Sequence, residues 1–308
     1  MEERKEIKKL ITKLNNLSVN HLFQIYFIMF KKKTNLEKHQ IINELLYPLE
    51  EENFKYLIDN DPKKLNIEYR KKRLNAVTFH GTKYGQVDKF KKILENTIGK
   101  NWEKKVLDVS ESLNIPNIKR LGVPGRQGTV IQLTHDNKKY AIKVTQKGVK
   151  CGDGATGGMG FLKQARMQEI SFNHDVTCQV HAIYCGDKKE SSFMVMDVMG
   201  ERLVDLYRNK EMSQKHQKQL WDLYKKLDEE VGIIHNDINP LNIMTDLDGN
   251  LKLIDFDRSK ITEYKDIKKW GKYPNLRFTH LLSLRKYKIS AKWFDEKYKK
   301  FKQNNYQV

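Results

Sequence analysis

A change in the hydrophobic pattern near Ile118 restricts the possible folds of this chain more than any other feature. Before that point, apolar residues recur every three or four positions, as in Ile7–Leu14 and Ile41–Leu46, which is typical of amphipathic helices. From Ile118 to Gln146, short runs rich in Val, Ile, Leu and Tyr are broken by turn residues, which is typical of strands. Helical spacing returns from Leu203 onward. The chain is therefore expected to have an α+β fold.

The rest of the chain predicts elements of both types. Phe161–Phe172 has a helical pattern, Ser192–Val198 is typical of a buried strand, and Ile233–Phe256 predicts a strand–loop–strand unit. The glycine-rich stretch Gly148–Gly160 predicts a mobile loop. We predict three segments: a helical N-terminal extension over residues 1–117, a small β-rich lobe over 118–199, and a compact helical lobe with a basic tail over 200–308.

The positive charge lies mainly at the two ends of the chain. Of a net charge of +19, residues 1–120 carry +9 and residues 258–308 carry +11, while residues 121–257 carry −1. Basic flanks attract polyanions such as nucleic acid, acidic membranes or phosphorylated substrates. A solvated charged surface explains them equally well. Leu17–Leu46 faintly resembles a SAP-type DNA-binding hairpin, but a helical extension that packs on the neighbouring lobe is the favoured interpretation.

The basic tail is also rich in aromatic residues, among them Phe294 and Tyr298. This content is too high for a merely solvated tail. We expect helices that pack on the preceding lobe and keep a basic outer face.

Cysteine usage and hydropathy predict an intracellular protein. The three cysteines are Cys151, Cys178 and Cys185, with no C-x-x-C pair, so neither a disulfide framework nor a zinc site is expected. The longest apolar stretch, His21–Phe30, is too short to span a membrane and is followed by three lysines. We expect no transmembrane segment and no secretory signal, and hence a cytoplasmic location.

Two features in the β-rich segment suggest contacts with phosphate. Gly122, Gly125 and Gly128 would let backbone N–H groups approach an anion, although a glycine-rich β-turn alone is the commoner explanation. Lys143 ends the apolar strand Tyr-Ala-Ile-Lys, and burying its stem is costly unless the ammonium meets an anion such as a phosphate or a carboxylate. Glu169 is the predicted carboxylate partner. An edge-strand lysine that points into solvent is the alternative.

Two further features suggest metal binding and proton transfer. In the stretch His-Asn-Asp-Ile-Asn-Pro-Leu-Asn, Asp237 and Asn242 would place a carboxylate base beside an amide oxygen that binds metal. In Leu-Ile-Asp-Phe-Asp, an apolar strand delivers Asp255 at its end, where a magnesium-binding carboxylate is wanted.

Taken in this order, the four features resemble the protein-kinase-like superfamily. Its pattern is a glycine-rich loop, a V-A-I-K lysine, a helix glutamate, an H-R-D-x-x-x-x-N loop and D-F-G. The resemblance covers Ile118–Arg258, and the separation of Asp237 and Asp255 is close to the family's usual one. It implies a bilobed fold with a small β-rich N-lobe and a truncated helical C-lobe. It also implies a phosphotransferase that uses ATP and Mg²⁺.

The resemblance also implies a role for each motif residue. Lys143 would hold the α- and β-phosphates, paired with Glu169, and Asp237 would orient or deprotonate the acceptor hydroxyl. Asn242 and Asp255 would bind the metal. Most of the rate would come from positioning and charge neutralisation.

The nucleotide itself would lie between the glycine-rich run and the strand near Met196. Gly122, Gly125 and Gly128 would cover the triphosphate, with Val130 at the end of the same run. Met196 falls near the gatekeeper position, and Asp197 to Met199 would lie beside the adenine.

The chain departs from the family pattern at several positions. Asn236 stands where many regulated kinases have Arg, so no activating loop phosphate is expected. Asn239 replaces a Lys, which removes one positive charge near the γ-phosphate, and Arg126 or a tail lysine is expected to replace it. Asp257 replaces the Gly of D-F-G, and no A-P-E follows. These motifs are similar to those of compact atypical kinases, namely the lipopolysaccharide-core sugar kinases and, in compactness, the RIO group.

The first functional hypothesis is a protein kinase that phosphorylates Ser or Thr. A glycan or small-molecule kinase is the alternative, and a pseudokinase or nucleic-acid-binding scaffold is a third class. Retention of the four motif residues Lys143, Asp237, Asn242 and Asp255 argues against a pseudokinase. Usage rich in Lys, Asn and Ile suits an AT-rich genome, such as that of a large DNA virus or an intracellular bacterium, so a location in a host cell or virion is included.

Overall fold

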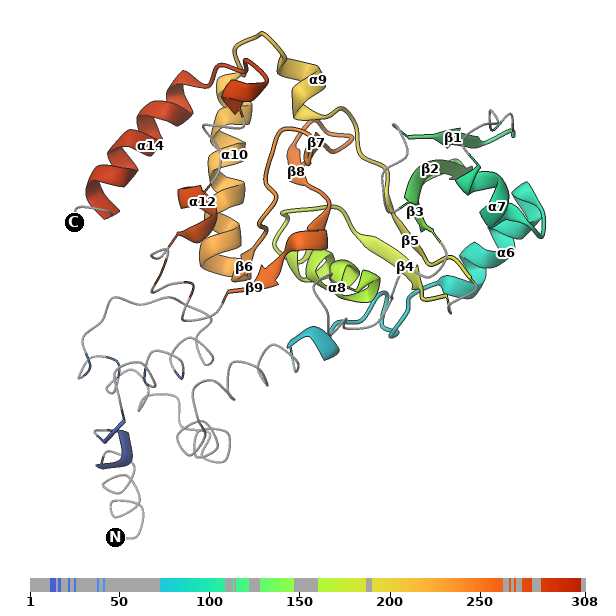
Figure 1. Ribbon diagram of the computed structural model, residues 1–308, viewed down its shortest axis with the longest axis horizontal. Coiled ribbons are helices and arrows are strands. Elements are labelled where there is room, and N and C mark those ends of the chain that lie inside the picture. The colour runs from blue at the N-terminus through green and yellow to red at the C-terminus, as the bar shows by residue number, and fades with distance from the viewer. Residues whose placement is uncertain are drawn as a thin grey trace.

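The strands predicted from Ile118 onward form one antiparallel sheet, as seen in the computed structural model (Figure 1). Its five strands lie in the order β1-β2-β3-β5-β4. They are β1 (Ile118–Arg120), β2 (Gly128–His135), β3 (Lys138–Thr145), β4 (Val180–Tyr184) and β5 (Phe193–Asp197). Asp136 and Asn137, both at positive φ, join β2 to β3 in the kind of tight turn that suits a hairpin.

Several features predicted from the sequence lie outside the part of the chain that the structure describes. It comprises residues 73–108, 113, 115–121, 128–146, 160–186, 190–262, 266, 269, 273–278 and 284–305, with residues 12–14, 16, 17, 22, 25, 38 and 41. Gly122, Gly125 and Arg126 lie outside it, as do almost all of the predicted loop Gly148–Gly160 and most of Leu17–Leu46. Among the residues within it, no helix is long and apolar enough to cross a membrane.

Each face of the sheet is covered by a different group of helices. Helices α6 (Val87–Ile98) and α7 (Trp102–Leu107) bury their apolar side chains against one face, together with Ile131 and Ile142. Helix α8 (Phe161–Phe172) has the bounds predicted from the sequence and lies on the other side of the sheet. It contacts β4 on one side and the second lobe on the other.

The second lobe is mainly helical and follows β5 along the chain. It comprises α9 (Leu203–Tyr207), α10 (Gln214–Lys226), the π-helical turn η1 (Leu227–Val231), β6 (Ile233–Ile234), β7 (Ile243–Thr245), β8 (Leu251–Leu253), the 3₁₀ turn η2 (Phe256–Arg258), β9 (Lys260–Ile261), α12 (Pro274–Phe278) and α14 (Lys292–Asn305). Strand β6 pairs with β9, and β7 pairs with β8. The protein therefore has the bilobed α+β fold that the sequence predicted.

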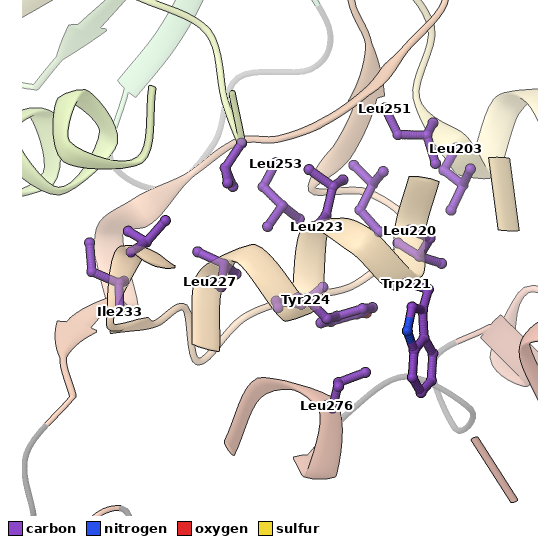
Figure 2. Close-up of a cluster of buried hydrophobic side chains, with 14 of the residues drawn as sticks. Leu203, Leu220, Trp221, Leu223, Tyr224, Leu227, Ile233, Leu251, Leu253 and Leu276 are labelled. Carbon is purple, nitrogen blue, oxygen red and sulfur yellow. The ribbon is translucent and has the colours of Figure 1, made fainter. Parts of the chain in front are cut away.

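The core of this lobe forms around α10 (Figure 2). Ser213 caps the helix by accepting a hydrogen bond from the His216 N–H, and the apolar side of the helix then packs against β8 and α12. The predicted packing of the tail is observed for Phe294 and Tyr298, which are buried in the same cluster, and Trp221 meets Phe294 edge to face.

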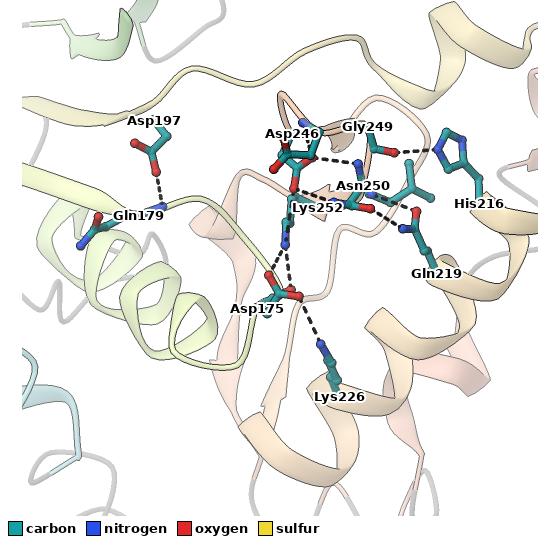
Figure 3. Close-up of polar contacts among 12 residues, drawn as sticks. Asp175, Gln179, Asp197, His216, Gln219, Lys226, Asp246, Gly249, Asn250 and Lys252 are labelled. Atoms are coloured by element: carbon teal, nitrogen blue, oxygen red, sulfur yellow. Dashed lines mark hydrogen bonds and ion pairs between the residues drawn. The ribbon is translucent and has the colours of Figure 1, made fainter. Parts of the chain in front are cut away.

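A polar network around the buried Lys252 fixes β8, which leads into Asp255 (Figure 3). The Lys252 ammonium donates to the Asp175 carboxylate, and Asp246 Oδ2 lies 3.7 Å from the same nitrogen. Lys226 of α10 reaches Asp175 at 3.5 Å. Because Lys252 is buried, these carboxylates offset the cost of removing its charge from water. The network joins β8, α10 and the turn after α8.

One expectation about the cysteines is wrong. Cys185 is disulfide-bonded, while Cys178 is free and buried. Burial raises the pKa of the Cys178 thiol to about 12, so it behaves as a small apolar side chain. An odd number of cysteines without a C-x-x-C pair said nothing about which of them approach each other in the fold.

Candidate active site

Lys143 extends from the face of the sheet that lies opposite α6 and α7. In the ladder it is directly opposite Val130 of β2 and Met194 of β5. Its Nζ atom lies 2.9 Å from Asp255 Oδ1, and the pair is largely withdrawn from solvent. The sheet thus supplies a cation to the carboxylate at the end of β8. The alternative of a lysine that points into solvent is wrong.

Gln164, and not Glu169, is the helix residue next to this ion pair. The Gln164 side chain is only 3% exposed; its Oε1 lies 3.5 Å from Lys143 Nζ, and its Nε2 donates to Asp255 Oδ1 at 3.2 Å. Glu169 lies further along α8, where its Oε2 accepts the Val180 N–H at 3.2 Å. Burial raises the pKa of Glu169. The predicted contact between Lys143 and Glu169 is therefore replaced by a bridge through Gln164.

Asp255 stands at a sharp change of backbone direction between β8 and η2. Its φ of 63° and ψ of 68° lie in the left-handed region, which is uncommon outside glycine although aspartate tolerates it better than most residues, so the turn benefits from support by its neighbours. The flanking Ile254 supplies that support: its N–H donates to the Asn242 carbonyl at 2.9 Å, and its carbonyl lies 3.0 Å from His235 Nε2. The Asp255 turn and the loop that carries Asp237 are thus held side by side.

Asp237 and Asn242 meet within that loop, as the sequence predicted. Asn242 Nδ2 donates to the Asp237 carbonyl at 2.9 Å and to Asp237 Oδ2 at 3.1 Å. Asn239 stays inside the loop: its Nδ2 donates to the Asp237 carbonyl and its Oδ1 accepts the Leu241 N–H. The other carboxylate oxygen of Asp237 lies 3.8 Å from Arg258 Nη1.

His235 and Asn236 fix the start of this loop. His235 is fully buried, and burial lowers its pKa to about 4, so the neutral imidazole contacts Ile254 and the ring of Phe256. Asn236 adopts a φ of 62°, which asparagine tolerates better than most residues, and its Nδ2 donates to the Arg258 carbonyl at 3.0 Å. The loop is therefore tied to the residues on both sides of Phe256.

The oxygen atoms around Asp255 are of the kind that suits a divalent cation. Asp257 Oδ1 is buried and has no hydrogen-bond partner in the part of the chain that the structure describes. Burial raises the pKa of Asp257, and the nearby Asp255 raises it further. The amide oxygen of Asn242 is likewise without a hydrogen bond within the described residues. Such hard oxygen donors fit Mg²⁺.

These oxygens do not form a cage on their own. Across the described residues, no three His, Cys, Asp or Glu side chains form a cluster that would hold a metal. Magnesium in nucleotide sites is commonly held by one or two protein side chains together with substrate phosphates. The donor set around Asp255 fits that kind of shared site.

The residues that would face an adenine ring differ in the contacts they make. Met196 lies in β5, opposite Ala141 and beside the cluster formed with Phe161. The backbone N–H of Asp197 donates to the Gln179 carbonyl, and its carboxylate accepts the Gln179 N–H (Figure 3). By contrast, neither backbone polar group of Met199 forms a hydrogen bond with other described residues.

The side chain of Asp197 is engaged elsewhere. Its Oδ1 lies 2.7 Å from His181 Nε2, and His181 Nδ1 lies 2.9 Å from His80 Nε2. Burial alone would raise the pKa of Asp197, but the contact with His181 leaves it lowered. This chain of contacts joins the segment before α6 to the sheet, so the carboxylate has a structural role here.

Of the predicted glycine-rich run, the structure describes Gly128. A Cβ atom at this position would lie 2.0 Å from the Val144 carbonyl oxygen, and its φ is 156°. Glycine is therefore required by the close pairing of β2 with β3. Gly122 and Gly125 lie outside the described residues, so their predicted approach to the triphosphate remains a prediction.

The comparison with protein families decides what this arrangement is. The model of the protein kinase domain matches residues 116–279, which is more than half of the chain. The chain belongs to the protein kinase family. Kinases of this family transfer a phosphoryl group.

Solved structures and curated proteins add little to the family assignment. The kinase PK-1 of Cydia pomonella granulovirus is similar to this chain with 16% sequence identity and a TM-score of 0.36. The match covers 47% of this chain and 53% of the granulovirus chain, so it spans about half of each. A search of curated proteins gives no match.

Three residues at this candidate site were not predicted as site residues. Gln164 lay in a helix whose sequence offered Glu169 as the only carboxylate, and Asp257 was noted only as a departure from the family motif. Arg258 follows directly, and its distance to Asp237 emerges only from the fold. A signal was present for the last two, since both follow closely on Asp255, which the sequence predicted as a magnesium ligand.

Proposed function

We propose that this kinase is an ATP- and Mg²⁺-dependent protein kinase that phosphorylates Ser or Thr. The observation that carries the proposal is that two pairs of side chains lie at the joined turns. Lys143 meets Asp255 on the side of the sheet, and Asp237 meets Asn242 on the side of the second lobe. A nucleotide and an acceptor hydroxyl need such separate positions around one phosphorus atom.

Each residue has a defined task in this proposal. The Lys143 ammonium binds the α- and β-phosphates once it leaves Asp255, and Gln164 holds the Asp255 carboxylate in place while it does so. Asp255 and the amide oxygen of Asn242 are the proposed magnesium ligands. A bound Mg²⁺ would neutralise charge on the phosphates.

Asp237 orients the acceptor hydroxyl and takes its proton. The hydrogen bonds from Asn242 to the backbone carbonyl and to Oδ2 of Asp237 fix this residue, so that the acceptor oxygen is aligned with the γ-phosphorus. Met199 offers its free backbone groups to adenine, and Val130 lies opposite Lys143 on the same face of the sheet. The contributions of Gly122 and Gly125 to covering the phosphates belong to the same proposal.

The acceptor is the least constrained part of the proposal. The matching family is that of the protein kinase domain, which supports a protein acceptor. The sequence Ile-Asp-Phe-Asp-Arg, similar to that of the sugar kinases, keeps a glycan as the alternative. Both are alcohols, so the same base, Asp237, serves either one.

An assay with labelled ATP and Mg²⁺ tests the proposal. The purified protein is incubated with casein, and in parallel with a deacylated lipopolysaccharide core glycan, and the labelled casein is hydrolysed for phosphoamino-acid analysis. We expect phosphoserine or phosphothreonine, and none with the Asp255→Asn variant, which lacks the metal-binding carboxylate. Transfer to the glycan alone would make the alternative correct, and labelled tyrosine would contradict the Ser/Thr specificity.

A further inference from the structure

Arg258 lies beside the carboxylate that acts on the acceptor. Its Nη1 atom is 3.8 Å from Asp237 Oδ1, and its side chain is 67% exposed. At this distance and exposure, the contact contributes little to folding stability. The position of the guanidinium therefore calls for an explanation other than stability.

The backbone around Arg258 is fixed, although its side chain is largely exposed. Its carbonyl accepts a hydrogen bond from Asn236 Nδ2 at 3.0 Å, and the next residue, Ser259, donates through Oγ to the His235 carbonyl at 3.3 Å. Lys260 then pairs with Ile234 in the β6–β9 ladder. His235 and Asn236, just before Asp237, thus form hydrogen bonds with Ser259 and Arg258. The Cα atom of Arg258 is anchored next to the catalytic loop.

The local charge balance shows why a cation is useful there. Asp237, Asp255 and Asp257 place three carboxylates around the same two turns, and among the described residues Lys143 pairs with Asp255 and not with Asp237. The side-chain amide of Asn239 forms hydrogen bonds inside the loop, and this residue carries no charge. Within the described chain, Arg258 is the cation that forms an ion pair with Asp237.

We propose that Arg258 is a catalytic residue that binds the phosphoryl group during its transfer. The inference rests on the proposed function and deepens it. In the step, the acceptor hydroxyl oxygen forms a bond to the γ-phosphorus of ATP. The bond from that phosphorus to the bridging oxygen of ADP breaks, and ADP keeps its electron pair. The hydroxyl proton goes to Asp237. As charge gathers on the equatorial oxygens of the phosphoryl group, the guanidinium leaves Asp237 and donates to them.

The chemistry of the side chain fits this role. A guanidinium is planar, always charged and able to donate two parallel hydrogen bonds to phosphate oxygens. Its release from Asp237 also frees a carboxylate oxygen for the proton of the acceptor. An arginine that merely bound a negatively charged acceptor would act before the chemical step and would lower KM rather than raise kcat.

The test compares Arg258→Gln and Arg258→Lys with the wild-type kinase in two reactions. One is transfer from ATP to casein, and the other is hydrolysis of ATP with water as acceptor and no protein present. Arg202→Gln is the matched control, because Arg202 is also a partly exposed arginine in an ion pair, and its side chain contacts Asp205 and none of the proposed site residues in the part of the chain that the structure describes. A thermal melt of each variant checks the fold, which the exposed side chain should not disturb.

We expect Arg258→Gln to lower kcat about 100-fold or more in both reactions, with KM for ATP changed less than about threefold. The kcat of Arg258→Lys should lie between those of Arg258→Gln and wild type, because lysine keeps the positive charge but cannot donate two parallel hydrogen bonds. Arg202→Gln should match wild type. Wild-type kcat in Arg258→Gln overturns the inference, as does a raised KM for casein with unchanged hydrolysis, which would make Arg258 an acceptor-binding residue. A wild-type protein that transfers phosphate to neither acceptor contradicts the proposed function itself.

Discussion

Replacing Gln164 by leucine tests whether a neutral amide supports the Lys143–Asp255 pair. The side chain is almost fully buried, and leucine has a similar size, so the change removes the polar bridge without leaving a large cavity. Asp255 would lose the hydrogen bond from Nε2 at 3.2 Å, while its ion pair with Lys143 would remain.

The expected loss follows from that single hydrogen bond. A hydrogen bond to a charged group contributes about 1.5–3 kcal/mol. The contact of Gln164 with Lys143, at 3.5 Å, is at the limit of hydrogen bonding and adds little. Since 1.4 kcal/mol corresponds to a factor of ten, kcat/KM should fall about 10- to 100-fold if the bond persists in the transition state.

Glu169→Gln provides the matched control in the same helix. Glu169 accepts the Val180 N–H, and a glutamine oxygen would do the same. Because burial already disfavours the ionised form of Glu169, a neutral amide should cost little stability. Activity should stay within about twofold of wild type, since the residue does not reach Lys143.

The measurement is kcat and KM for ATP in the casein assay, with a thermal melt of each variant. The reasoning is refuted if Glu169→Gln loses activity while Gln164→Leu keeps it, because the helix glutamate would then support Lys143 in the working enzyme. A collapse of the melt in Gln164→Leu would instead make the bridge a structural feature of the lobe contact.

Three further predictions concern other parts of the chain. The folded pKa of His235, about 4, lies below the unfolded value of 6.5, so the unfolded state binds more protons between these values. Stability should therefore fall as pH drops from about 6.5 to 4, by roughly 3 kcal/mol, and a His235→Gln variant should show a flatter dependence in denaturant titrations. Phe294→Ala should lower the free energy of unfolding by about 3–5 kcal/mol in urea titrations, because the ring is 1% exposed. With Asn236 in place of Arg, phosphatase-treated protein should keep its full rate; a rate lost on treatment and restored by autophosphorylation would contradict this.

The sequence predicted the elements that carry the site because their patterns are local. Phe161–Phe172 repeats apolar residues at helical spacing after a glycine, and the helix has those bounds. Lys143 follows three residues of an apolar strand, which fixes its position in the sheet. Asp237 and Asn242 meet because their loop is short. Each of these predictions depended only on residues that are close together in the sequence.

The choice between Gln164 and Glu169 depended on how α8 is rotated against the sheet. Five residues along a helix correspond to about 140° around its axis, so the two side chains face different neighbours. Most of the helix is buried, including polar residues on several sides, so the sequence shows no polar face that would reveal the rotation. Packing against β4 and η2 decides it.

The sequence pattern also did not predict contacts between segments that are far apart in the chain. Arg258 meets Asp237 because β6 pairs with β9 and Asn236 holds its carbonyl, and none of these pairings has a local signal. His181 engages Asp197 through the pairing of β4 with β5, which the prediction of an adenine-side Asp197 did not include.

The central claim is that Asp237 acts on the acceptor hydroxyl, while the nucleotide is held by Lys143 and Asp255. Binding of Mg²⁺–ATP and single-turnover transfer to casein, measured together for Asp237→Asn, test it most directly. Asparagine keeps an oxygen for the hydrogen bond from Asn242, so the loop should stay in place. The account predicts that the variant binds Mg²⁺–ATP as wild type does and transfers phosphate at least about 100-fold more slowly. Transfer at the wild-type rate, or loss of nucleotide binding with the fold intact, would contradict it.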